Sequence, residues 1–149
     1  MKISTILVPT DFSEDAASAL AMAKELAGKL GSRLVILHAY RVDLPMATPD
    51  LGGGFILPDR FYEELRASAT KQVEALAAET AKTGVAVEGV AIEERPASAI
   101  VETAKRLPAD LIVMGTRGLT GLAHVVLGSV ADRVIREATC PVLTVRAKG

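Results

Sequence analysis

The sequence predicts an α/β fold, built as one open sheet of five parallel strands with helices on both faces. Short apolar runs rich in β-branched residues alternate with longer stretches whose apolar residues recur at helical spacing, which is typical of strand–helix–strand units. The runs Leu34–Leu37 and Leu111–Met114 are continuously apolar, as expected of strands that helices cover on both faces. The length of 149 residues suits one compact domain, so we assign residues 1–149 to a single unit.

Five segments are predicted to be strands. They are Ile3–Val8, Arg33–Ala39, Ala86–Ile92, Leu111–Met114 and Pro141–Val145. The last has apolar residues at alternate positions near the C-terminus and is expected to form an edge of the sheet. Because right-handed crossovers and a reversal of strand order leave a crevice at the carboxyl ends of the central strands, we expect a ligand there.

Four helices are predicted around these strands. The first begins after Ser13, which suits the N-cap position, and ends at Gly31, where a C-cap glycine is common. Its apolar stripe comprises Ala16, Leu20, Ala23, Ala27 and Leu30. The second runs from about Asp59 to Lys82, with Phe61, Leu65, Ala69, Val73 and Leu76 at helical spacing. The third starts at Pro96 and stops before Pro108, and the fourth runs from Ser129 to about Ala138.

Composition and charge exclude several classes of function. With 17 basic and 18 acidic residues and 3% aromatic content, nucleic acid is not expected as a partner. No stretch approaches the roughly 20 apolar residues of a membrane span, and Pro9 and Asp11 interrupt any signal-peptide core. We therefore expect a cytoplasmic protein without a membrane partner. The single cysteine, Cys140, excludes an internal disulfide and is expected to be a small buried side chain.

Residues 43–58 show neither helical nor strand periodicity and contain three prolines and three glycines. The segment is longer than a simple connection between two elements. A lid over the crevice and a solvated insertion or dimer contact are both compatible with it.

A glycine-rich loop follows the fourth predicted strand. Gly115 and Gly118 lie directly after that strand, and Gly128 with Ser129 opens the last helix. Glycine lets a phosphate approach the backbone and permits positive φ, and a helix start offers free N–H groups and the positive end of its dipole. The spacing is neither Gly-x-Gly-x-x-Gly nor the P-loop pattern. These residues alone therefore favour phosphate binding, with purely structural turns as the alternative.

The spacing resembles the signature of a known family. Gly115, two residues, Gly118, nine residues and then Gly128-Ser129 match the Gly-2x-Gly-9x-Gly-Ser/Thr pattern of the ATP-binding branch of the universal stress protein family. The segments Ile6–Ser13, Leu37–Ala39 and Cys140–Val145 are also similar to that family. The resemblance covers essentially the whole chain and implies a Rossmann-like sheet of the adenine nucleotide alpha hydrolase type, with strand order 3-2-1-4-5.

The resemblance also implies a ligand and its contacts. The ligand would be ATP, with Mg²⁺ held mainly through the phosphates. The adenosine would be surrounded by Pro9, Thr10, Asp11 and Ala39, with Met114 near the base or ribose. The ribose and phosphates would be held by Gly115, Gly118, Gly128, Ser129 and Val130. A homodimer through antiparallel pairing of the last strand, Val142–Val145, is implied as well.

Several side chains have competing interpretations. Asp11 follows an apolar strand, where a carboxylate can meet a ribose or base, yet it could also help to cap the first helix. The guanidinium of Arg117 could reach a phosphate or lie exposed without a role, and we count Arg117 among the candidate contacts. His38 and His124 form no recognisable metal-binding pair. We expect His38 to be packed or partly buried and His124 to lie on the loop surface.

Three functions remain open: a regulatory protein whose ATP occupancy changes its shape or partners, a slow ATPase, and an interaction module with an empty loop. The complete glycine pattern argues against the third. No lysine follows the loop as in P-loop enzymes, and the sequence offers no convincing water-activating base besides Asp11, whose expected place is at the base end of the ligand. Efficient hydrolysis is therefore not expected. The loop does not discriminate ATP from ADP, AMP or cyclic AMP.

Overall fold

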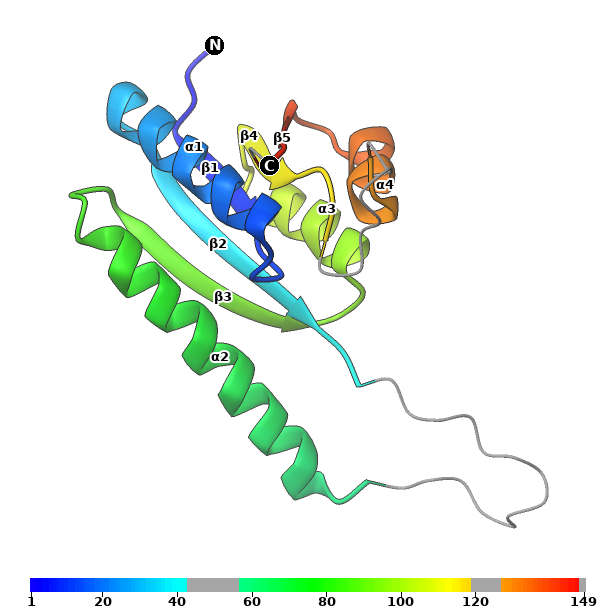
Figure 1. The fold of residues 1–149 in the computed structure, drawn as a ribbon. Coiled ribbons are helices and arrows are strands. Elements are labelled where there is room, and N and C mark those ends of the chain that lie inside the picture. Colours follow the sequence, from blue (N-terminus) through cyan, green and yellow to red (C-terminus); the bar gives the residue numbers. More distant parts are fainter. Residues whose placement is uncertain (43–56, 119–126, 148–149) are drawn as a thin grey trace.

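The sheet has five strands in the order β3-β2-β1-β4-β5, and neighbouring strands pair in parallel (Figure 1). This computed structural model describes residues 1–42, 57–118 and 127–147. The strands are β1 (Thr5–Pro9), β2 (Arg33–Tyr40), β3 (Val87–Glu93), β4 (Leu111–Gly115) and β5 (Val142–Val145). The predicted fold class and strand order are confirmed.

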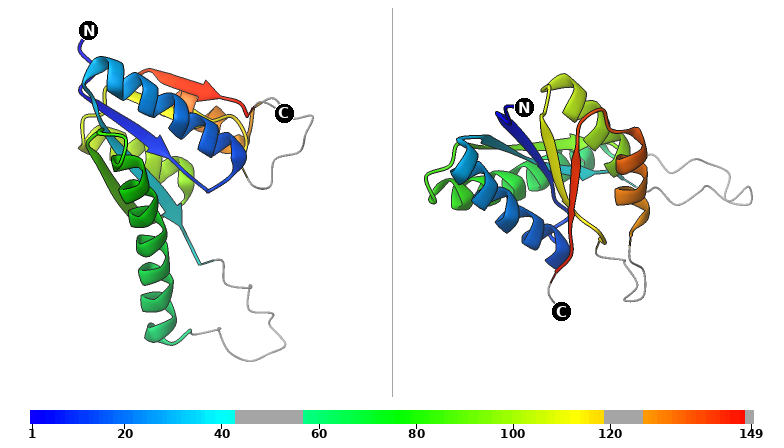
Figure 2. Two further views of the ribbon diagram at one scale, coloured as in Figure 1. Left: turned by 60° about the vertical axis from the view of Figure 1, so that its left-hand side comes forward. Right: turned by 90° about the horizontal axis from the view of Figure 1, so that it is seen from above.

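Helices cover the sheet on both faces (Figure 2). They are α1 (Glu14–Leu30), α2 (Asp59–Ala81), α3 (Pro96–Arg106) and α4 (Ser129–Glu137). Successive side chains of a strand point to opposite faces, so Ile6 and Val8 of β1 pack with α1 and α2, while Leu7 packs with α3 and α4. Every residue of β1 is buried, which makes this strand the centre of the core.

Local signals set the helix ends as expected. The Ser13 hydroxyl accepts a hydrogen bond from the N–H of Ala16 at 3.2 Å and caps α1, while Gly31 ends it in a left-handed conformation with φ 69°. Pro96 occupies the first turn of α3, where its missing N–H costs nothing.

Two apolar residues of the predicted stripes are exposed instead of buried. Leu30, at the end of α1, is 50% exposed, and Phe61, at the start of α2, is 42% exposed. The first turns of α2 project beyond the sheet (Figure 1), and the first buried residue of this helix is Ala69. Helical spacing fixes the direction of a side chain, but burial also requires a neighbouring element at that level.

Part of the predicted loop at 43–58 lies outside the described residues, which resume at Leu57. Among the helices of the described ranges, none is both long enough and apolar enough to cross a bilayer.

The two glycines at the end of α1 should respond oppositely to the same substitution. Gly31→Ala places a Cβ in a left-handed backbone and should lower the free energy of unfolding by about 1–2 kcal/mol. Gly28→Ala, inside the helix with no atom within 4 Å of the new Cβ, should raise it by about 0.5–1 kcal/mol. Urea unfolding of the two variants checks this, and changes of the same sign would contradict it.

Candidate functional site

A cavity of about 510 Å³ lies where β1, β2 and β4 end. Every residue predicted to contact the ligand lines it: Pro9, Thr10, Asp11, Ala39, Met114, Gly115, Arg117, Gly118, Gly128, Ser129 and Val130. The volume is in the range of small-molecule sites in proteins. The structure therefore brings segments from the two halves of the chain to one place.

The cavity also has walls that sequence reasoning missed: Ala16, Leu37, Pro96, Ile100, Thr116 and Ala131. Pro96 and Ile100 come from α3, which begins soon after the carboxyl end of β3. The signal that could have found Pro96 is its place at a helix start, because the helices that follow parallel strands begin at this edge of the sheet.

Part of the cavity wall is apolar. Leu37, Ile100 and Met114 line the cavity and are almost completely buried, and they belong to the same cluster as the faces of α3 and α4 that meet the sheet. A flat apolar group such as a nucleobase would replace water beside these side chains without leaving a charge unpaired.

Another part of the cavity wall is the first turn of α4, whose Ala131 belongs to the same apolar cluster. Gly128 occupies the N-cap with φ −72° and, having no side chain, cannot cap the helix as Ser13 caps α1. The N–H of Gly128 donates to the carbonyl oxygen of Thr116 at 2.6 Å. Residues Ser129–Ala131 also line the cavity, and an acceptor for their N–H groups must come from outside the helix. An uncapped helix start of this kind favours an anion.

The loop glycines are required by close contacts within the protein. A Cβ at Gly115 would lie 2.8 Å from Cβ of Asp15, and one at Gly118 would lie 2.5 Å from Oδ2 of Asp11. A Cβ at Gly128 would lie 3.0 Å from the carbonyl oxygen of Thr116. The expected use of positive φ is wrong, since the described glycines with positive φ are Gly31 and Gly84. The loop instead uses glycine because other chain segments pack directly against it.

The turn between β1 and α1 is held by its own side chains. Oδ1 of Asp11 accepts the N–H of Ser13 at 3.0 Å, and Oγ1 of Thr10 accepts the N–H of Phe12 at 3.0 Å. Phe12 has φ 63°, a strained conformation for a bulky residue. Asp11 therefore supports the helix start and lines the cavity at once, so its two interpretations are compatible. No sequence signal marks the strained Phe12.

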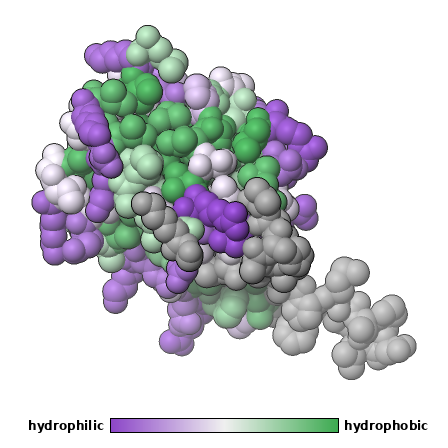
Figure 3. All heavy atoms as spheres, turned by 45° about the horizontal axis from the view of Figure 1, so that its top comes forward, coloured by the Kyte–Doolittle hydropathy of each residue, from purple (hydrophilic) through white to green (hydrophobic). Residues whose placement is uncertain are grey.

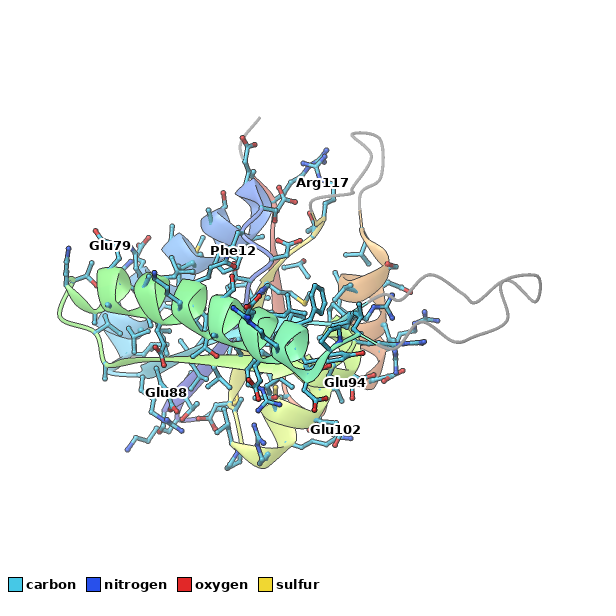
Figure 4. All side chains as sticks on the ribbon, turned by 90° about the horizontal axis from the view of Figure 1, so that it is seen from below. Phe12, Glu79, Glu88, Glu94, Glu102 and Arg117 are labelled. Atoms are coloured by element: carbon cyan, nitrogen blue, oxygen red, sulfur yellow. The ribbon has the colours of Figure 1, made fainter. Side chains whose placement is uncertain are left out.

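Arg117 pairs with a residue that the sequence analysis had not linked to it. The Arg117 side chain lies near the first turn of α1 (Figure 4). Its Nε lies 3.3 Å from Oδ2 of Asp15, and its side chain is 20% exposed against 6% for Asp15. The N–H of Arg117 and the hydroxyl of Thr116 also donate to Oδ2 of Asp15, at 3.1 and 3.0 Å. An acid in the first turn of a helix interacts favourably with the helix dipole, but Asp15 also binds the loop that follows β4.

Burial by itself would raise the pKa of Asp15. Hydrogen bonds from Ala147, Arg117 and Thr116, together with the charge of Arg117, outweigh that effect and hold the pKa below its ordinary value. Asp15 is therefore a carboxylate at neutral pH.

The remaining side chains that were considered for chemistry are two histidines and one cysteine. His38 is partly buried, as expected; its Nδ1 lies 3.1 Å from the carbonyl oxygen of Thr10 and its ring lies 4.8 Å from that of Phe12. Cys140 is partly buried rather than fully buried, and burial raises the pKa of its thiol. His124 lies outside the described residues. Within the described ranges, no three His, Cys, Asp or Glu side chains gather as a metal site.

The family description "Universal stress protein family" matches residues 2–146. The chain belongs to the universal stress protein family. The "universal stress protein in QAH/OAS sulfhydrylase 3'region" of Thermus aquaticus is 42% identical over 144 residues, which cover 95% of this chain and 98% of that protein.

Solved structures of the universal stress protein family share the fold. A universal stress protein in complex with cAMP has 27% identity and a TM-score of 0.65, covering 99% of this chain and all of the other. One from Archaeoglobus fulgidus in complex with dAMP has 26% identity and a TM-score of 0.66, covering 97% and 99% of the two chains.

Gly115→Ala should lower the free energy of unfolding more than Gly118→Ala does. At Gly115 the new Cβ meets Cβ and the backbone carbon of Asp15, at 2.8 and 2.9 Å, so the start of α1 must move. We expect Gly115→Ala to lower the free energy of unfolding by about 1–3 kcal/mol. At Gly118 the Cβ meets only the Asp11 carboxylate, which can rotate, so the loss should be smaller. Equal losses in urea unfolding would contradict this steric account.

Proposed function

We propose that this universal stress protein binds an adenine nucleotide, ATP with Mg²⁺, and acts in the cytoplasm as a nucleotide-dependent regulatory protein of the stress response. The observation that carries the proposal is one cavity whose wall combines apolar side chains with a helix start. The apolar side chains of Leu37, Ile100 and Met114 suit a base, and the start of α4, which has no side-chain cap, suits phosphate.

The relatives support the adenine part of this proposal. The two solved universal stress proteins described above are complexes with cAMP and dAMP, which share adenine and a phosphate. In the present chain, Pro9, Thr10, Asp11 and Ala39 would then lie around the adenosine. The glycines of the loop, with Arg117, Ser129 and Val130, would meet the ribose and phosphates.

Mg²⁺ would be coordinated mainly by the nucleotide rather than by protein side chains. Asp11 is the one carboxylate among the described lining residues, and a single carboxylate does not make an all-protein cage for Mg²⁺. The phosphates would supply most of the ligands. Because no second acid or base lines the described wall to orient a water, we propose binding without efficient hydrolysis.

Calorimetric titration of nucleotide-free protein with Mg-ATP tests the proposal. Asp11→Ala removes an acceptor beside the proposed adenosine and should weaken binding by about tenfold or more. Gly118→Ala should weaken it similarly, because the new Cβ both narrows the phosphate approach and displaces the Asp11 carboxylate. Gly28→Ala is the matched control and should bind like the wild type.

Two outcomes would contradict the nucleotide proposal. One is the absence of binding by folded wild-type protein, which would favour an interaction module with an unused loop. The other is unchanged affinity in both site variants. Many turnovers per second in a hydrolysis assay, abolished by Gly118→Ala, would instead replace the binding role by an ATPase.

We further propose a homodimer through β5. This strand is an edge of the described sheet, and Leu143 at its centre is 37% exposed. Ile135 on α4, the helix just before β5, is 45% exposed. Apolar side chains are also visible at the surface of the molecule in the view of Figure 3. An unpaired apolar edge favours pairing with a second strand.

Leu143→Lys should convert the dimer to a monomer, because it places a charge in the centre of the proposed interface. Light scattering at micromolar concentration measures this directly. Phe61→Lys is the matched control, since Phe61 is similarly exposed but lies on α2, which packs against the opposite edge strand. A wild-type monomer, or a dimer that both variants retain, would contradict the interface.

A further inference from the structure

Asp15 joins the proposed phosphate loop to the end of β5. Its Oδ2 accepts the Thr116 hydroxyl and the Arg117 N–H, and its Oδ1 accepts the N–H of Ala147 at 3.0 Å. The two segments also contact each other, because the N–H of Thr116 donates to the carbonyl oxygen of Val145 at 3.0 Å. One buried carboxylate therefore ties the start of the glycine loop to Ala147, two residues beyond the C-terminal strand.

A favourable interaction with the helix dipole does not explain this arrangement. An exposed acid in the first turn of α1 would provide that interaction without the cost of burial, and the neighbouring Glu14 is such a residue. The N-cap of α1 is already filled by Ser13. The described donors to Asp15 lie outside α1, on the two segments that follow β4 and β5.

We propose that Asp15 is a positioning residue that couples nucleotide occupancy of the cavity to order at the C-terminal end of β5. This inference rests on the proposed nucleotide binding. Both oxygens belong to one rigid carboxylate, so a ligand that holds Thr116 and Arg117 in place also holds the acceptor of the Ala147 N–H. The coupling is reciprocal: order at residues 145–147 strengthens nucleotide binding by the same factor.

Amide hydrogen exchange of residues 142–147, with and without saturating Mg-ATP, measures this coupling. In the wild type we expect Mg-ATP to slow exchange of these amides by about tenfold. Asp15→Asn keeps the size of the side chain but removes its charge and one acceptor oxygen, and should abolish the slowing. Glu14→Gln removes one negative charge from the same helix turn and should retain it. A purely structural role would change exchange equally with and without nucleotide.

A second pair of variants serves if Asp15→Asn does not fold. Ala147→Pro removes the N–H that donates to Oδ1 and fixes φ at that position, close to the C-terminus, whereas Ala147→Ser keeps the N–H. We expect Ala147→Pro to bind Mg-ATP without slowing exchange at residues 142–146, and Ala147→Ser to behave like the wild type.

Calorimetric titration of the same samples with Mg-ATP distinguishes a failure of the proposed nucleotide binding from a failure of the proposed coupling. If wild-type protein does not bind Mg-ATP, the proposed function and this inference both fall. If it binds but exchange at residues 142–147 is unchanged or faster, the coupling is wrong and nucleotide binding stands. Slowing that persists in Asp15→Asn, or in Ala147→Pro, also overturns the coupling through Asp15.

Discussion

The parallel pairing of β1 with β2 on one side and β4 on the other is the constraint on which the site depends. Parallel strands end at the same edge of a sheet, so the chain after β1 and the chain after β4 emerge side by side. The N–H of Thr10 continues this ladder by donating to the carbonyl oxygen of Leu37 at 2.8 Å. The cavity forms where these segments part, and α3 and α4 close its remaining sides.

Close packing at this edge of the sheet requires glycine in the loop, and the proposed phosphate binding favours glycine there as well. Gly115 lies against the first turn of α1, Gly118 against Asp11, and Gly128 against the backbone of Thr116. Small size is therefore needed for the fold even without a ligand. A phosphate placed at the start of α4 would exploit the same lack of side chains, so stability and the proposed binding select the same residue type.

The cationic side chain of the glycine loop is already paired within the protein. Between Gly115 and Ala131 the basic residues are Arg117 and His124, and the guanidinium of Arg117 already faces the buried Asp15. The proposed phosphates would therefore meet backbone N–H groups and a helix dipole more than side-chain cations. In that arrangement the exact placement of the loop matters, which gives Asp15 its importance as the residue that holds Thr116 and Arg117.

The sequence by itself determined the strands, the helices and their order, because these follow from local periodicity and from caps such as Ser13, Gly31 and Pro96. The spacing of Gly115, Gly118, Gly128 and Ser129 also located the cavity wall without the structure. Only the tertiary structure decided that Leu30 and Phe61 are exposed, that Ile100 lines the cavity, and that Asp15 holds Arg117. Those features depend on which segments meet in space; Asp15 and Arg117 are 102 residues apart in sequence, beyond the reach of any local pattern.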